Sequence, residues 1–144
     1  MRSHPVSPQR RFLLVFDKEE DLLPALRAFA ETHGIRGAAF VALGAFRSAT
    51  VAYWNPSTKA YEHIAVDEQV EVLSLAGNIG VQGAETKIHA HVTLGRRDGS
   101  AIGGHVIAAT VFPTLEMDLV DYGAAIVRGT DDETGLSLID DIAR

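Results

Sequence analysis

Three of the six histidines in this 144-residue chain fall between residues 87 and 105. His89 and His91 lie in residues 87–94, where apolar and polar side chains alternate, and this period of two is typical of a β-strand. Both side chains therefore point to the same face. Asp98 and Gly99, a pair typical of turns, follow this strand and precede a second apolar segment, residues 101–111. Together these patterns predict a β-hairpin.

The position of His105 depends on the length of the turn. If the loop has three residues, 97–99, with Gly99 in the left-handed conformation, His105 lies directly opposite His91 and all three imidazoles share one face. A two- or four-residue loop, or a bulge in the second strand, would turn His105 to the other face, because a shift of one residue inverts every side chain. We prefer the three-residue loop because its glycine stands where the left-handed conformation is needed.

Three imidazoles on one face are typical of a metal site. Neutral imidazole binds zinc, nickel or copper, so the pattern predicts zinc or another divalent transition metal held by His89, His91 and His105. Water, a carboxylate or a bound ligand would complete the coordination. The alternative is that these histidines are only solvated or hydrogen-bonded. Cysteine is absent, which excludes thiolate ligands and disulfides.

The composition indicates an acidic protein, and the length of 144 residues indicates a single domain. The formal net charge is −6, and only residues 10–11 and 96–97 are adjacent cations. Duplex DNA is bound mainly through clustered cations, so direct DNA binding without a partner is poorly supported by composition. The apolar run at residues 12–16 is too short for a signal peptide or a membrane span. We therefore expect a cytoplasmic protein without membrane contact.

The histidine hairpin must be positioned by one helix and several other strands. Asp21 is placed as an N-cap, apolar residues follow it at helical spacing, and Gly34 closes the segment. Strands are expected at residues 11–16, 38–43, 48–54, 61–66, 70–76, 101–111, 115–121 and 124–128. The glycine-rich residues 77–83 are expected to form a loop.

This pattern predicts an α+β fold, a mostly antiparallel β-sheet with one principal α-helix packed on it. We expect a flexible N-terminal arm at residues 1–10, a single domain at 11–138 and a C-terminal tail at 139–144. Several strands are apolar on both faces, which is more than one helix can cover. A second copy of the chain is the simplest partner for the remaining apolar surface.

Five short motifs in this order resemble the plants-and-prokaryotes-conserved (PPC) domain of AT-hook nuclear proteins, which also occurs alone as a small bacterial protein. They are DLLPALRAFAETHG at 21–34, GAFR at 44–47, EVLSLAGN at 71–78, HAH at 89–91, and GGH at 103–105 followed by PTLE at 113–116. The resemblance covers residues 11–138.

The resemblance implies a homotrimer with one helix on an antiparallel sheet. It also carries the family's usual label of DNA-binding protein, and so suggests DNA or a DNA-binding protein as a partner. In plant members DNA contact is attributed to a separate Arg-Gly-Arg-Pro hook, and this chain contains no such sequence. The segment aligned with the plant partner-binding motif, residues 68–73, departs from it at its first three positions.

Two classes of function follow. The first and preferred one is a non-catalytic regulatory or assembly module, a DNA-binding PPC homotrimer with a three-histidine metal site. The second is a metal-dependent enzyme or small-molecule-binding protein that uses the same histidines. An enzyme would need a base or an anion clamp nearby, for which Arg47, Glu71 and Glu116 are candidates. We favour a surface or interface ion pair for Arg47, and the alternative for Glu71 is a sheet-edge or interface carboxylate.

Overall fold

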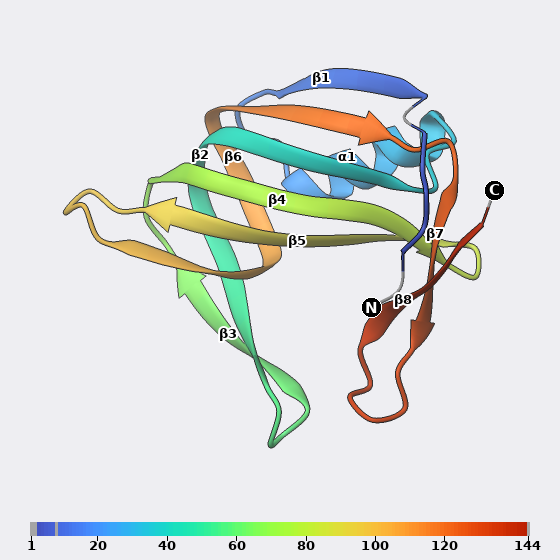
Figure 1. The fold of residues 1–144 in the computed structure, drawn as a ribbon. Helices are drawn as coiled ribbons and strands as arrows, with labels where there is room; N and C mark the ends of the chain where they lie inside the picture. The colour runs from blue at the N-terminus through green and yellow to red at the C-terminus, as the bar shows by residue number, and fades with distance from the viewer. Residues whose placement is uncertain (1–2, 8, 144) are drawn as a thin grey trace.

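The computed structural model describes residues 3–7 and 9–143. The expected arm and tail therefore lie partly outside the described residues, at positions 1, 2, 8 and 144. One helix and eight strands are found in the described part of the chain (Figure 1). In chain order they are β1 (Arg10–Phe16), α1 (Leu22–Thr32), β2 (Ala38–Asn55), β3 (Ala60–Val66), β4 (Val70–Gln82), β5 (Glu85–Gly95), β6 (Ala101–Asp121), β7 (Ala125–Thr130) and β8 (Ser137–Ala143).

The strands form one sheet in the order β3-β2-β6-β5-β4-β7-β8, with β1 added beside β6. All pairings are antiparallel except a short parallel contact between β4 and β7, at Val81 and Val127. Because β2 also pairs with β4, strands β2, β6, β5 and β4 form a closed circuit. The predicted α+β fold is confirmed, and its two longest strands, β2 and β6, bend through the whole molecule (Figure 1).

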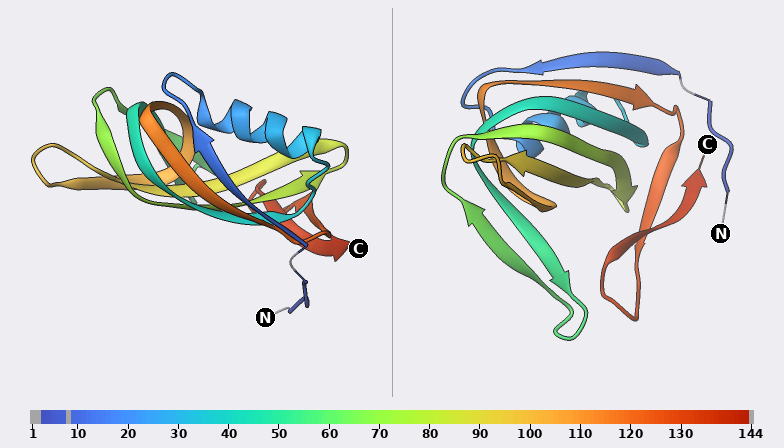
Figure 2. Two further views of the ribbon diagram at one scale, coloured as in Figure 1. Left: turned by 90° about the horizontal axis from the view of Figure 1, so that it is seen from above. Right: turned by 60° about the vertical axis from the view of Figure 1, so that its left-hand side comes forward.

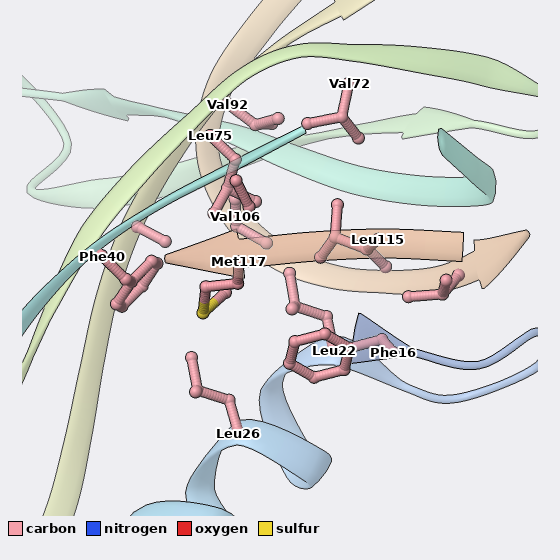
Figure 3. Packing of buried hydrophobic residues seen from close by; sticks show 14 of the residues in the cluster. Phe16, Leu22, Leu26, Phe40, Val72, Leu75, Val92, Val106, Leu115 and Met117 are labelled. Carbon is pink, nitrogen blue, oxygen red and sulfur yellow. The ribbon is translucent and has the colours of Figure 1, made fainter. Parts of the chain in front are cut away.

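Helix α1 covers one face of the sheet (Figure 2). Its buried positions, Leu22, Leu26 and Ala30, are four residues apart and so form one stripe. Leu22 and Leu26 point towards Leu115 and Met117 of β6, and all four belong to the hydrophobic core (Figure 3). The helix begins after Asp21 and ends before Gly34, whose φ of +65° suits a left-handed C-terminal cap, as the sequence predicts.

The opposite face of the sheet carries exposed apolar side chains on three strands. They are Leu13 and Val15 of β1, Val41 and Leu43 of β2, and Leu73 of β4, each more than half exposed. Leu13 and Val41 flank the same β6 residue, Asp118, from either side, and Val15 and Leu43 flank Glu116 in the same way. We call these five residues the outer apolar face. The helix thus leaves apolar surface uncovered, on strands β1, β2 and β4.

The prediction of a loop at residues 77–83 was wrong. Strand β4 continues through Gln82 and pairs with β5 along this length. A Cβ at Gly77 would collide with the carbonyl oxygen of His89 and the ring of Phe40, and one at Gly80 would lie 2.7 Å from the carbonyl oxygen of Ile126. These glycines allow neighbouring chains to approach closely within the sheet.

The C-terminal residues take part in the sheet. Strand β8, which includes residues 139–143 of the expected tail, pairs with β7 as a hairpin (Figure 1). No helix in the described part of the chain is long and apolar enough to cross a membrane.

Candidate metal centre

The turn between β5 and β6 has the predicted three-residue loop. Arg96 and Ser100 close it, since the Arg96 N–H donates to the Ser100 carbonyl oxygen at 2.8 Å. Gly99 has a φ of +83°, in the left-handed region. The Asp98 carboxylate accepts hydrogen bonds from the Ser100 N–H at 2.9 Å and hydroxyl at 2.6 Å, which lower the pKa of Asp98 and hold the turn.

This turn sets the register that brings the three histidines together. His91 of β5 is the direct partner of His105 of β6, as the sequence predicts. His89 is two residues from His91 and shares its face of β5, and their Nε2 atoms lie 3.2 Å apart. The ring centroids of the three imidazoles are separated by 5.0 to 5.4 Å, and one possible ligand atom from each lies within 4.8 Å of the others.

Residues of neighbouring strands lie beside two of these histidines. The ring of Tyr61 from β3 stacks on His105 with the centroids 4.8 Å apart. Asn78 of β4 is the direct partner of His89 across the β4–β5 pairing. The Nδ1 atom of His105 is buried and has no hydrogen-bond partner in the described structure. A nitrogen in this state has a lone pair or a proton to offer to a further group.

Burial keeps two of the three histidines, His89 and His105, neutral. Desolvation lowers the pKa of His105 to about 4, with further contributions from His89, His91 and the positive charge of Arg128. Desolvation also lowers the pKa of His89, and Arg128 and His91 add to the effect. At neutral pH both imidazoles are therefore uncharged, the form that a metal ion requires.

The three-histidine cluster fits a divalent metal. Two nitrogens that each lie about 2.0–2.1 Å from a tetrahedral zinc ion are separated by roughly 3.3–3.4 Å. The 3.2 Å between the Nε2 atoms of His89 and His91 is close to that value. The unpaired Nδ1 of His105 and the neutral state of the His89 and His105 rings also fit metal binding.

A cavity of about 590 Å³ adjoins two of these histidines. It lies between the β2–β3 hairpin and the β7–β8 hairpin, which both project below β5 in Figure 1. Its lining residues come from β3, β5, β6, β7, β8 and the β7–β8 loop, and are Tyr61, Lys87, Ile88, His89, His105, Arg128, Gly135, Leu136, Ser137, Leu138 and Ile139. The cavity is thus open to a molecule that also reaches the histidine cluster.

Arg128 is the charged residue most deeply placed at this cavity. It lies on β7 and is only 7% exposed. Its guanidinium donates to the side-chain oxygen of Asn78 at 2.5 Å and to the carbonyl oxygen of Ser137 at 2.6 Å. Burial lowers its pKa from the ordinary value. These two bonds hold the guanidinium beside the strand pair that carries His89.

The other candidates named from sequence do not line the cavity. Arg47 forms an ion pair with Glu19 and lies over the ring of Phe112, so it makes the surface ion pair that we favoured. Glu71 is exposed on β4 opposite Gly95. Glu116 is exposed on the outer apolar face of the sheet.

Sequence analysis missed Arg128, Tyr61 and Asn78. Asn78 and Tyr61 stand in segments whose alternation gives no functional signal. Arg128 does give one, because it is a charged residue that directly follows three apolar residues in the short strand AIVRGT. Its place beside the histidines depends on the distant contact between β4 and β7, which no local pattern predicts.

The sequence matches the family model of the Plants and Prokaryotes Conserved domain, abbreviated PCC or PPC, over residues 3–122. The chain belongs to this family. The match includes β1 to β6 and all three histidines, so the resemblance seen in the short motifs is confirmed. The sequence has no match among curated proteins.

Solved structures of other proteins have the same PPC fold. The metal-containing protein from Archaeoglobus fulgidus is 34% identical, with a TM-score of 0.91 over 98% of this chain and 100% of that chain. A PPC protein from Pyrococcus horikoshii is 30% identical, with a TM-score of 0.91 and 98% of each chain covered. A protein named "putative DNA-binding protein" from Bacteroides thetaiotaomicron is also 30% identical, with a TM-score of 0.87 over 94% of this chain and 96% of that chain.

Proposed function

We propose that this PPC protein binds one divalent transition metal, zinc in the simplest case, through His89, His91 and His105, and that the metal serves a small-molecule-binding site. The observation that carries the proposal is the convergence of three imidazoles, two of them kept neutral by burial, at the edge of a cavity of about 590 Å³. Three protein ligands leave one position of a tetrahedral ion open, as is usual where the metal meets a ligand or substrate. The name of the Archaeoglobus relative, a metal-containing protein, supports the same assignment.

We further propose that the protein assembles as a homotrimer. The support is the outer apolar face, whose five residues are between 53% and 75% exposed in the single chain. Exposed apolar side chains gathered on one side of a sheet often mark a site of protein association. Here they flank two acidic residues of β6, Glu116 and Asp118. The face lies on the side of the sheet that α1 leaves uncovered, so a partner copy can pack there without displacing the helix (Figure 2).

Metal content tests the central proposal. Protein purified without a tag should contain about one divalent metal per chain, because a single chain supplies all three ligands. His91→Ala should lose most of this metal, whereas His63→Ala, which changes an exposed histidine on β3, should retain it. A metal content near zero in the wild-type protein, after incubation with zinc and removal of excess ion, would contradict the proposal.

The oligomeric state of the same variants separates two roles of the metal. If His91→Ala loses the metal but keeps its assembly, the metal serves the cavity. If it dissociates, the metal has a structural role at the interface between copies. Size-exclusion chromatography with light scattering distinguishes the two results.

A DNA-binding or regulatory role is the second candidate. Relatives from Bacteroides thetaiotaomicron and Ralstonia eutropha carry the name of putative DNA-binding proteins, which favours it. Against direct binding, five cations of the described chain are paired with carboxylates; they are Arg10, Arg11, Arg47, Lys87 and Arg96. Paired cations gain little by neutralising phosphates. This candidate therefore fits binding through a partner protein better than direct contact.

Electrophoretic mobility shift at two salt concentrations tests direct DNA binding. Retention of a duplex at low salt that weakens steeply at higher salt would support it, because phosphate contacts release counterions. Absence of retention at low salt would remove direct binding and leave a role through partner proteins.

A further inference from the structure

We infer that the cavity beside the histidine cluster binds a small organic carboxylate, and that Arg128 pairs with its carboxylate group. This inference rests on the proposed metal site and names the class of ligand that the site receives. It follows from three observations: the charge of the cavity, the state of the Arg128 guanidinium, and the apolar walls.

The cavity is positive in a protein that is negative as a whole. Its charged lining residues are Arg128 and Lys87, and none of its described lining residues is Asp or Glu. Lys87 is paired with Glu85 outside the lining, so the uncompensated charge at the cavity is that of Arg128. The whole chain has a formal net charge of −6. Three neutral imidazoles would leave the double positive charge of a bound metal uncompensated, which adds to the same sign. The cavity is therefore built for an anion.

Arg128 has donors left for such an anion. Its two acceptors described above, the Ser137 carbonyl oxygen and the Asn78 side-chain oxygen, are uncharged. Each terminal nitrogen of the guanidinium carries two N–H groups and donates one of them to these acceptors. One N–H therefore remains on each terminal nitrogen. Two parallel N–H groups of arginine match the two oxygens of a carboxylate. Because the side chain is 7% exposed and already anchored, little of its freedom is lost on binding.

The walls favour an organic ion over inorganic phosphate. Ile88, Leu136, Leu138 and the ring of Tyr61 line the same cavity as Arg128. Leu138 is 45% exposed, so its apolar surface is accessible to a ligand in the cavity. The volume of about 590 Å³ is ample for a small molecule with an apolar part. We therefore assign the carboxylate group to Arg128 and the apolar part of the ligand to these walls.

Cobalt spectroscopy tests the inference apart from the metal site itself. The protein is loaded with Co²⁺, whose visible absorption reports on its ligands, and is titrated with benzoate, butyrate, inorganic phosphate and uncharged benzamide. Benzoate or butyrate should bind and benzamide should not. Arg128→Gln should bind Co²⁺ as the wild type does, but should bind benzoate at least about tenfold more weakly, because a charged hydrogen-bonded pair is lost.

Matched variants complete the experiment. Arg97→Gln removes an exposed arginine from the β5–β6 turn and should leave benzoate binding unchanged. If Arg128→Gln does not fold, Lys87→Gln replaces it, and benzoate binding should weaken at least about threefold, since a charge at the same cavity is removed. Benzoate binding should be followed by isothermal titration calorimetry as well as by absorption.

The two proposals fail in different ways. If the wild-type protein takes up no Co²⁺, the proposed metal site is wrong and the inference falls with it. If Co²⁺ binds but neither carboxylate does, or only phosphate binds, the inference alone is overturned. Carboxylate binding that is equally strong in a folded Arg128→Gln variant would also overturn it.

Discussion

The site depends on three imidazoles, and the surroundings of two of them, His89 and His105, oppose protonation. His105 lies against the ring of Tyr61, and His89 lies near the charged guanidinium of Arg128. A protonated ring here would lose water and face a positive neighbour, so both pKa values are depressed. A metal ion, by contrast, binds the neutral form and meets no competing proton near neutral pH.

The depressed pKa values predict that the metal-free protein loses stability on mild acidification. An unfolded histidine has a pKa of about 6.5, whereas that of folded His105 is about 4. Below pH 6.5 the unfolded state binds more protons than the folded state, so the free energy of unfolding falls as the pH decreases towards 4. Urea denaturation of the metal-free protein at pH 7 and pH 5 measures this change.

His105→Gln should reduce that pH dependence, because the variant lacks the group that titrates. His63→Gln, at an exposed position on β3, should behave like the wild type. A wild-type protein equally stable at both pH values, with no difference from His105→Gln, would contradict the assigned shift.

At the level of elements, the sequence predicted correctly those features that depend on neighbouring residues in the chain. The hairpin that joins β5 and β6 was predicted to the correct register, because residues 97–99 set it by turn chemistry alone. The glycines at 77–83 were interpreted as a loop signal. Gly77 and Gly80 instead allow β4 to pack closely against distant parts of the chain. The role of Arg128 was missed for the same reason, as β7 reaches the site through a contact between Val81 and Val127.

The conformation of Gly99 allows us to predict how substitutions in this hairpin change the free energy of unfolding. Its φ is +83°, yet a Cβ there would meet no heavy atom within 4 Å. A substitution is therefore limited by backbone strain and not by collision. Gly99→Val should lower the free energy of unfolding by about 1–2 kcal/mol, whereas Gly99→Asn should lower it less, because asparagine visits the left-handed region more readily. Equal effects of the two substitutions in chemical denaturation would show that the turn imposes no such conformation.

At the scale of the whole molecule, the two faces of the sheet have separate tasks. Helix α1 closes the core on one side, and the outer apolar face is left on the other (Figure 2). The histidine cluster and its cavity are built from the β5–β6 hairpin and the projecting β2–β3 and β7–β8 hairpins. None of the five outer-face residues lines that cavity, so assembly and ligand binding can be altered independently.

This separation predicts that a single charge on the outer apolar face abolishes assembly and spares the metal site. Leu43 is 61% exposed and lies directly opposite Glu116, so Leu43→Lys places the new cation beside a carboxylate and leaves the single chain folded. A lysine buried between copies would be desolvated, and the trimer should dissociate in light-scattering measurements. Tyr53→Lys is the matched control, because Tyr53 is 60% exposed, faces Glu62 in the same way, and lies outside this face. It should remain trimeric, and both variants should retain about one metal per chain. If Leu43→Lys and Tyr53→Lys have the same mass in solution as the wild type, copies of the chain do not meet through the outer apolar face.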